Sequence, residues 1–543
     1  MVFARRSTTL LAAIIASCAM VLSLTACTSD NKTVVDGQTT VTSNSAGGVA
    51  VFTPSDGITL NQQTPLNKWA KLVPDLAKAL ADAGFKKGDI DHTTSDSLAK
   101  QSRAIQDFVV DHLSNNTTDD SGIAIAPDNM TLLVAPVVEA DASTRQYGDY
   151  ISQNLSTNDA TDGEATSDGE SSEDDSSKDD SSNTESDSTA SDEQAQAVDR
   201  LVSSLKLAKE SGMHVVLLGN SIEGYKPDAF VKFSDAQTIG KLQAEKMVSK
   251  LKLDKASKDN PKYIEVLLPY TAVDEKGNAN DSAFAQEAFR GIWQVLGSYY
   301  QKGVVESPSG TLDGKSTEND WQAVAYDAAE ESSTAKVLDK RLAKTDGQST
   351  LTRIDGIITM NDYIASEVVK ELDDLGYTGS AADINPQITI SGIVGNITGK
   401  KDLSRDAVPD PIKSPENDNA NDSSSSDDDA DEDTSASDKD RDSQWPLVTG
   451  YGAYVSNIPS IVNGKQWMTG MEDRQTIATD IAQACAKLNK DEALNSMPSI
   501  RNSEVGGVKK IPTISEPLLA VSASNLKSAL IDPGYISLAD AGL

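Results

Sequence analysis

The stretch IDGIITMNDYIASEVVKELDDLGY, residues 354–377, shows the pattern on which the folded part of this chain is built. Its first part, DGIITM (355–360), is a short apolar run of the kind that forms a buried strand. In the part that follows, apolar side chains recur every three or four positions, which predicts an amphipathic helix. A strand followed directly by a helix is the repeating unit of a parallel sheet.

The same alternation runs through most of the chain from about Gly47. Further strands are predicted at 49–54, 123–127, 131–137, 214–219, 263–269, 387–393 and 446–451. Further helices are predicted within 66–85, 196–212 and 238–251. Gly84 should end the first of these helices, because glycine readily takes the left-handed conformation of a C-terminal cap. The pattern predicts an α/β protein with parallel sheets.

The negative charge of the chain is concentrated in two segments. The 543 residues carry a formal net charge of −35. Residues 159–193 hold 14 acidic side chains and one lysine (−13), and residues 402–442 hold 15 acidic and four basic ones (−11). The wider segments 151–194 and 402–444 are poor in apolar side chains, so we predict two disordered acidic insertions. Neither has the spacing of a calcium loop, and the overall charge argues against a nucleic-acid partner.

The N-terminus has the pattern of an export signal. Two arginines precede an apolar run, and the run ends in Leu-Thr-Ala-Cys, which resembles the signal of bacterial lipoproteins. We therefore predict a signal peptide at 1–26, a lipid on Cys27, and a polar tether at 27–46 that holds the protein on the extracytoplasmic face of the cell membrane. An ordinary signal peptide with a chance cysteine is the alternative.

The remaining cysteines cannot form an internal disulfide. Cys18 leaves with the signal peptide, so Cys485 is the one thiol in the predicted folded part. Cys485 lies at helical spacing with Ile481 and Leu488, which favours a buried structural thiol over a nucleophile. After the signal, the sequence contains no run of 18 apolar residues, so no membrane-spanning helix is predicted there.

The sequence shows no pattern typical of a catalytic or metal site. The three histidines, His92, His112 and His214, have no partners at metal-ligand spacing. GNSIEG (219–224) departs from a serine nucleophile elbow, and GIVGNITGKK (392–401) departs from a phosphate loop. We therefore predict no catalytic residue, no metal and no cofactor. A pair of carboxylates for glycoside cleavage stays open, because 83 acidic residues make any chosen pair uninformative.

Polar and aromatic side chains follow the predicted strands. Asn220, Asn361, Asp362 and Tyr451 each come directly after an apolar run. Ligands of open α/β sheets bind outside the carboxyl ends of the strands. Aromatic faces beside amides and carboxylates suit a sugar, although strand ends are polar in many folds of this class.

Stretches along nearly the whole folded part resemble, in order, the type I periplasmic sugar-binding proteins of ABC transporters, in particular the xylose and multiple-sugar branch. The tail IPTISEPLLAVSASNLKSALIDPGYISLADAGL (511–543) is the most specific piece, because the family ends with a proline-led strand, an Asn-Leu pair and a Gly-Tyr close. The other pieces are the opening stretch (354–377), LNKWAKLVPDLAKALADAGF (66–85), GMHVVLLGN (212–220), FSDAQTIGKLQAEKMV (233–248), ANDSAFAQEAFRGIWQVL (279–296) and VTGYGAYVSNIPSIVNGKQWMT (448–469).

The resemblance implies two Rossmann-like lobes, joined by a three-segment hinge, that close on a sugar. It places the N-terminal lobe at 47–220 and 471–515, the C-terminal lobe at 221–470, and a hinge strand with the tail at 516–543. The two acidic segments then become insertions, one in each lobe.

Carried over residue by residue, the resemblance implies that Trp69 stacks on the sugar. It also implies that polar side chains bind the hydroxyl groups, namely Asp235, Asp281, Asn361 and Asp362. The chain departs from the family in three places: Asn220-Ser221 stands for an Asp-Arg pair, Gly452 for an Asp, and Glu472 for a Lys. Because asparagine cannot replace a bidentate arginine without loss, the fold transfers more safely than the ligand.

The sequence therefore predicts a monomeric, lipid-anchored solute-binding protein that captures a sugar and delivers it to the permease of an ABC transporter. The alternative is a sensory or structural surface lipoprotein of the same fold, with a degenerate or different ligand site. An exported carbohydrate-active enzyme is the third and weakest alternative.

Overall fold

The computed structural model describes most of the part that the sequence predicts to fold. The described residues are 46–55, 65–115, 125–138, 144, 146–156, 184–273, 282–328, 330, 332–343, 351–382 and 443–543. Residues 45–543 form one compact unit. Several predicted features lie outside the described residues: the signal peptide, Cys27 and nearly all of the tether, Asp281, the strand at 387–393, and the acidic stretches 157–183 and 402–442.

Seven strands form the first sheet, in the order β15-β16-β7-β5-β3-β1-β2. They are β1 (Gly48–Pro54), β2 (Ile90–Ser95), β3 (Met130–Val134), β5 (His214–Leu218), β7 (Ala229–Lys232), β15 (Ile500–Val505) and β16 (Val508–Ser515). All neighbours pair in parallel except β15 and β16, which form an antiparallel hairpin. The inner strands are rich in valine and leucine because a parallel sheet is covered on both faces.

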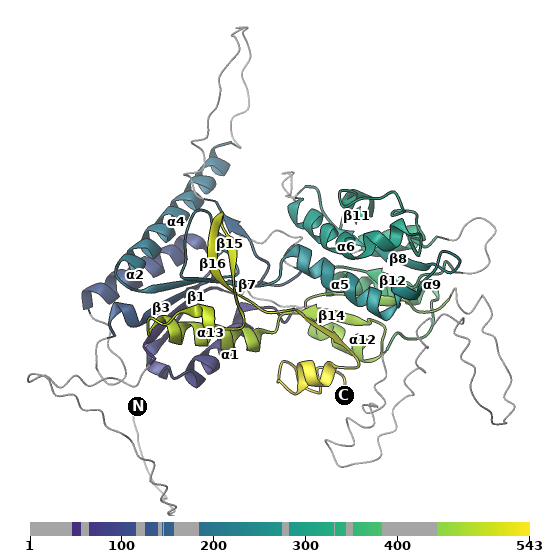
Figure 1. Ribbon diagram of the computed structural model, residues 1–543. Coiled ribbons are helices and arrows are strands. Elements are labelled where there is room, and N and C mark those ends of the chain that lie inside the picture. The colour runs from purple at the N-terminus through teal and green to yellow at the C-terminus, as the bar shows by residue number, and fades with distance from the viewer. Residues whose placement is uncertain are drawn as a thin grey trace, which may run out of the picture. The chain divides into compact units, whose positions relative to one another are not determined.

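Helices cover both faces of this sheet, as Figure 1 shows. One face carries α1 (Trp69–Asp82) and α13 (Arg474–Leu488), and the other carries α2 (Leu98–Asn115) and α4 (Thr184–Glu210). Side chains along β1 alternate between the two cores. Val49 and Val51 pack against α1 and α13, whereas Ala50 and Phe52 pack against α2 and α4. This alternation follows from the two-residue period of a strand.

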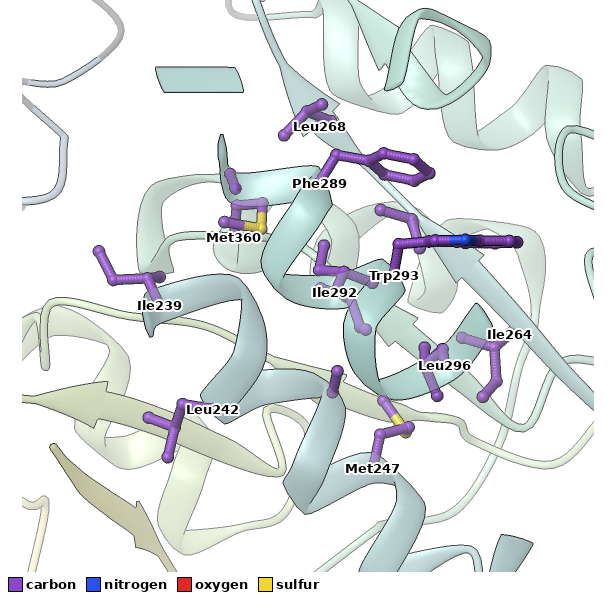
Figure 2. Packing of buried hydrophobic residues seen from close by; sticks show 14 of the residues in the cluster. Ile239, Leu242, Met247, Ile264, Leu268, Phe289, Ile292, Trp293, Leu296 and Met360 are labelled. Atoms are coloured by element: carbon purple, nitrogen blue, oxygen red, sulfur yellow. The ribbon is translucent and has the colours of Figure 1, made fainter. Parts of the chain in front are cut away.

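Four parallel strands form the second sheet, in the order β10-β8-β12-β13. They are β8 (Lys262–Val266), β10 (Val305–Glu306), β12 (Gly356–Ile358) and β13 (Leu447–Thr449). One face carries α5 (Ala236–Lys250) and α6 (Ala283–Gln301), and the other carries α8 (Ser333–Arg341) and α9 (Asp362–Leu375). Figure 2 shows the core on the α5 and α6 side, with Leu242 and Met247 on α5 and Ile292 and Leu296 on α6.

The remaining elements are short. Three pairs of strands are β4 (Asn154–Leu155) with β6 (Ser221–Ile222), β9 (Leu268–Pro269) with β11 (Ala325–Tyr326), and β14 (Met468–Met471) with β17 (Leu519–Ser522). The short α-helices are α7 (Trp321–Val324) and α12 (Ile458–Val462). Turns of 3-10 helix lie at Lys87–Asp89, Pro127–Asn129, Leu253–Lys255, Val455–Asn457 and Leu494–Ser496, and a π-helical turn lies at Lys527–Ile531.

The chain passes between the two sheets three times. It leaves the first sheet between β7 and α5, returns between β14 and α13, and leaves again between β16 and β17. These connections and the two helix-covered parallel sheets confirm the predicted α/β class with two Rossmann-like halves. Strand pairing puts β7 in the first sheet, so the first connection follows Lys232, whereas the sequence placed the lobe boundary at Asn220.

Two further predictions differ from the structure at described residues. The strand at 123–127 is not formed at 125–127, where Pro127 begins a 3-10 turn, because proline lacks the N–H that a strand ladder requires. The acidic insertion drawn at 151–194 is shorter at both ends. Ile151 and Leu155 are buried, and α4 begins at Thr184. The sequence also missed β2, an edge strand whose burial pattern is mostly exposed.

Candidate functional site

The residues predicted to bind a ligand lie at strand ends and helix starts of both halves. Asn220 follows β5, Asn361 and Asp362 follow β12, and Tyr451 follows β13. Trp69 begins α1, and Asp235 is the N-cap of α5. Two of them, Asp235 and Asn361, supply the side-chain caps that the helices after these strands need.

Trp69 lies in an aromatic cluster with Tyr150 and Phe233. Its side chain is 3% exposed. The Trp69 ring meets Tyr150 and Phe233 edge-to-face, with centroid distances of 5.1 and 5.7 Å, and Tyr150 stacks on Phe233 at 4.7 Å. Aromatic pairs at such distances stabilise packing beyond the area they bury. In this conformation the faces of Trp69 are covered by protein, so its stacking on a sugar stays a prediction.

Asn220 holds two parts of the backbone together. Its Oδ1 accepts a hydrogen bond from the Gln153 N–H at 2.9 Å, and its Nδ2 donates to the carbonyl of Pro136 at 2.9 Å. Asn220 stands where the family has the aspartate of an Asp-Arg pair. Its amide binds the backbone just ahead of β4.

Asp235 caps α5 by accepting a hydrogen bond from the backbone N–H of Thr238 at 2.7 Å. Partial burial opposes ionisation of this carboxyl, but hydrogen bonds from Lys232 and Thr238 outweigh that effect and lower its pKa. Asp235 is therefore a charged cap at the first connection between the sheets.

Asp362 is the centre of a buried hydrogen-bond network beside β12 and β13. Its carboxylate accepts from the N–H of Tyr454 at 2.9 Å, from the amide of Gln466 at 2.7 Å and from the hydroxyl of Thr469 at 2.8 Å. Burial raises the pKa of Asp362 to about 6, although these hydrogen bonds act in the opposite direction. The three donors explain why this position needs an acid, and a direct contact with ligand stays a prediction.

Asn361 caps α9 and also reaches a distant segment. Its Oδ1 accepts from the Ile364 N–H at 2.9 Å, while its Nδ2 donates to Oε1 of Gln146 at 3.0 Å. The side chain is buried. Asn361 therefore joins the carboxyl end of β12 to the chain that follows β3.

Tyr451 links two of the three connections through a buried triad. Its hydroxyl lies 2.5 Å from Oγ of Ser234, which follows β7. The hydroxyl of Ser234 donates to the carboxylate of Glu472, which follows β14, and the Ser234 N–H donates to the same oxygen at 2.6 Å. Burial raises the pKa of Glu472 to about 7 against the effect of these hydrogen bonds. Glu472, which stands where the family has a lysine, therefore binds Ser234 of this protein.

The structure adds a segment that the sequence did not single out. Residues 146–151, Gln-Tyr-Gly-Asp-Tyr-Ile, lie between β3 and β4 and contact Trp69, Asn361 and Tyr451. Two tyrosines flanking Gly148 and Asp149 were a signal of local structure. No helix or strand was predicted at 146–150, and Ile151 was placed at the start of the acidic insertion.

The described site residues offer aromatic rings, amides, hydroxyls and buried carboxyls. Groups of this kind recognise a small polar molecule by stacking and hydrogen bonding. In the part of the chain that the structure describes, no three His, Cys, Asp or Glu side chains are grouped to hold a metal ion. Cys485 is buried in the core, and burial raises the pKa of its thiol.

Comparisons with known proteins return structural neighbours. No protein-family model matches the chain, and no curated protein matches its sequence. Among the similar solved structures is an ABC transporter solute-binding protein from Clostridium phytofermentans with bound β-D-glucose (16% identity, 91% of this chain and 99% of that chain, TM-score 0.44). Another is a carbohydrate transporter solute-binding protein from Chloroflexus aurantiacus in complex with D-glucose (17% identity, 92% and 98%, TM-score 0.43). A third is an arabinose-binding protein from Geobacillus stearothermophilus (9% identity, 89% and 99%, TM-score 0.41).

All three TM-scores lie below 0.5, so the fold described here rests on strand pairing and helix packing rather than on these neighbours. Within the described residues, no helix is long and apolar enough to cross a membrane.

Proposed function

We propose that this chain is a solute-binding protein that captures a sugar between two lobes and delivers it to the permease of an ABC transporter. One observation carries the proposal: two parallel α/β sheets are joined by three connections, beside which residues from both halves meet. Several parallel connections allow two rigid halves to rotate about one line, which is the geometry of hinge closure. The carboxyl ends of parallel strands are where such folds bind ligands.

A sugar is the ligand class that the meeting residues favour. If the halves open, the rings of Trp69, Phe233 and Tyr451, which are buried here, could offer faces to the C–H groups of a pyranose. Asn361 offers an amide that both donates and accepts. An uncharged polyol needs several weak directional contacts and no counter-ion. The buried position of these groups would exclude water and strengthen each hydrogen bond.

In this proposal the protein does no chemistry, needs no cofactor and acts as a monomer. A lipid on Cys27 holds it on the extracytoplasmic face of the cell membrane. Closure on the sugar changes the surface that the two lobes present together, so the permease can bind the loaded form in preference to the empty one.

A thermal-shift screen tests the proposal. The full-length chain, purified in detergent, is heated with pentoses, hexoses and short oligosaccharides. A ligand that binds only the folded state at 100 times its Kd adds about 2.7 kcal/mol of stability, so we expect the Tm to rise by roughly 3 °C or more for at least one sugar. A screen in which no sugar changes the Tm rejects the proposal.

The variant Asn361→Asp refines this test. It keeps the side-chain oxygen that caps α9 but removes the N–H donor, so the protein should fold and the sugar-induced shift should be lost. Asn463→Asp is the matched control, because Asn463 is exposed in the turn after α12 and its side-chain oxygen accepts a local hydrogen bond from the Lys465 N–H. An undiminished shift in Asn361→Asp would place the ligand elsewhere.

A further inference from the structure

A short segment of this chain lies among the residues that the proposed function assigns to the ligand. We call residues 146–151 the strap; it comes from the loop between β3 of the first sheet and β4. The strap contacts Trp69, Asn361 and Tyr451, three of the residues predicted from the sequence to bind a sugar. A fourth, Asn220, binds the backbone just after the strap, at Gln153.

Gln146 makes the polar contacts of the strap with the second half of the molecule. Its side-chain oxygen accepts from Nδ2 of Asn361 at 3.0 Å, and its backbone carbonyl accepts from the hydroxyl of Tyr454 at 2.6 Å. Asn361 follows β12 and Tyr454 follows β13, so both donors stand beyond the carboxyl ends of neighbouring strands. The amide and carbonyl of Gln146 thus use hydrogen-bonding groups that a sugar hydroxyl could use.

Tyr147 makes the aromatic contacts. Its side chain is 1% exposed, and its ring lies 4.7 Å from Phe284 and 6.2 Å from Tyr451, measured between centroids. It belongs to the apolar core of the second sheet, although the chain that carries it comes from the first. A flat ring between other aromatic rings, at the end of parallel strands, is the position that a stacked sugar would take.

The other side of the strap is bound to the first half at the start of α1. Asp149 accepts from Nζ of Lys68 at 2.7 Å and from the Trp69 N–H at 3.1 Å, and the hydroxyl of Tyr150 donates to the Lys68 carbonyl at 2.6 Å. Gly148 lets the strap turn against Asn67: its φ is +97°, and a Cβ there would lie 2.5 Å from the Asn67 carbonyl oxygen. The strap therefore bridges the two halves.

We propose that the strap is an internal occupant of the ligand position, and that Gln146 and Tyr147 must leave before a sugar can bind. This inference rests on the proposed function and concerns the regulation of the same site. The placement of the strap supports this inference. The strap comes from the first half, contacts residues of the second half, and binds residues that a ligand would need.

With an internal occupant, the apparent Kd equals the intrinsic Kd divided by the fraction of molecules whose site is free. Weakening the strap should therefore tighten sugar binding. Tyr147→Ala removes the buried ring, and Gln146→Ala removes the bond to Asn361 while keeping the backbone carbonyl. If the strap fills the site in nine-tenths of the molecules or more, releasing it lowers the apparent Kd by about tenfold or more.

The experiment is a calorimetric titration of the full-length wild type and the variants with D-glucose and with D-xylose. Hydrogen exchange of the amides of residues 146–156 is followed with and without each sugar. We expect a lower Kd in Tyr147→Ala, a smaller decrease in Gln146→Ala, and faster exchange of the strap amides when sugar binds the wild type. Phe108→Ala is the matched control, because this half-buried aromatic residue of α2 packs on Phe52, on the opposite face of the first sheet from Trp69. Its Kd should equal that of the wild type.

The outcomes separate this inference from the proposed function. Binding by both strap variants that is weaker than, or equal to, wild-type binding overturns the internal occupant and leaves solute binding intact. Binding by Tyr147→Ala of a sugar that gives no heat with the wild type supports the internal occupant strongly. Absence of binding by the wild type and by both variants, repeated in the wider sugar screen, rejects the proposed function and this inference with it. If Tyr147→Ala does not fold, Gln146→Ala alone decides.

Discussion

Folding transfers the carboxyl group of Glu472 from water into a nearly closed site between two connections of the chain. The residue is 2% exposed, and its carboxylate accepts from the N–H and the hydroxyl of Ser234, with the Tyr451 hydroxyl beside them. Burial is the larger effect, so the pKa stands at about 7, above the ordinary value of 4.5. The folded protein therefore keeps a proton on Glu472 that the unfolded chain releases at lower pH.

This shift predicts a stability difference with a definite sign. Because the folded-state pKa is raised, the contribution of Glu472 is fully present below about pH 4.5 and is lost as the pH rises through about 7. A shift from 4.5 to about 7 corresponds to roughly 3 kcal/mol. Glu472→Gln imitates the protonated form and does not titrate. Its unfolding free energy, minus that of the wild type, should rise by up to about 3 kcal/mol between pH 4.5 and pH 8.

Urea unfolding of both proteins at several pH values measures this difference. Other titrating groups, including Asp362 with its pKa of about 6, are common to both proteins and cancel. Glu504→Gln, on the exposed part of β15, gives the baseline effect of replacing a glutamate. A Glu472→Gln difference that stays constant with pH, or falls, would contradict the buried-carboxyl account.

At the scale of elements, two glycines set the distance between α5 and α6. A Cβ on Gly291 of α6 would lie 2.0 Å from the carbonyl oxygen of Gln237 on α5, and a Cβ on Gly240 of α5 would lie 2.2 Å from the carbonyl of Ala288 on α6. Both clashes are with backbone, which cannot rotate away. The backbones therefore approach closely, and the large side chains seen in Figure 2 can pack around that contact.

We expect Gly291→Ala to destabilise the protein even though alanine is the better helix former. Alanine gains about 1 kcal/mol in helix propensity, but separating two packed helices costs about 1–3 kcal/mol or more, and a 2.0 Å approach puts the cost at the upper end. The unfolding free energy should fall by about 1–2 kcal/mol. Gln294→Ala, on the exposed face of the same helix, should change it by less than about 0.5 kcal/mol. A stabilised Gly291→Ala variant would show that the helices are farther apart than described.

The helices and strands differ in how far the sequence could predict them. The unit β12–α9 was predictable because its apolar run and its helical period are local properties, and the cap at Asn361 follows from residue type. The edge strand β2 was not, because its exposed face removes the apolar signal. The partners of Asp362 and Glu472, and the strap, depend on chain segments tens to hundreds of residues away. Residue type predicted that these positions are polar, but only tertiary packing decides what they bind.

The whole molecule combines a two-sheet body with acidic stretches and an N-terminus that carries the predicted anchor. Of the net charge of −35, the stretches 159–193 and 402–442 hold −13 and −11, so the rest of the chain carries −11. Charge therefore says little about the ligand and argues against adhesion to an anionic membrane surface. The predicted lipid on Cys27 would supply an attachment to the membrane that does not depend on charge.

The lipid on Cys27 can be tested directly. A bacterium that expresses the full-length chain is grown with an alkyne fatty acid, and the purified protein is examined for label and for its N-terminal mass. We expect label on the wild type and a mature chain that begins at Cys27, because the predicted signal peptide ends at residue 26. Paired acyl chains would give a stable anchor, which a single chain does not. Cys27→Ser should carry no label and should keep residues 1–26. Cys18→Ser is the matched control and should be labelled like the wild type, since Cys18 leaves with the signal peptide. An unlabelled wild type would replace the lipid anchor by an ordinary export signal. Label that persists in Cys27→Ser would place the lipid on another residue.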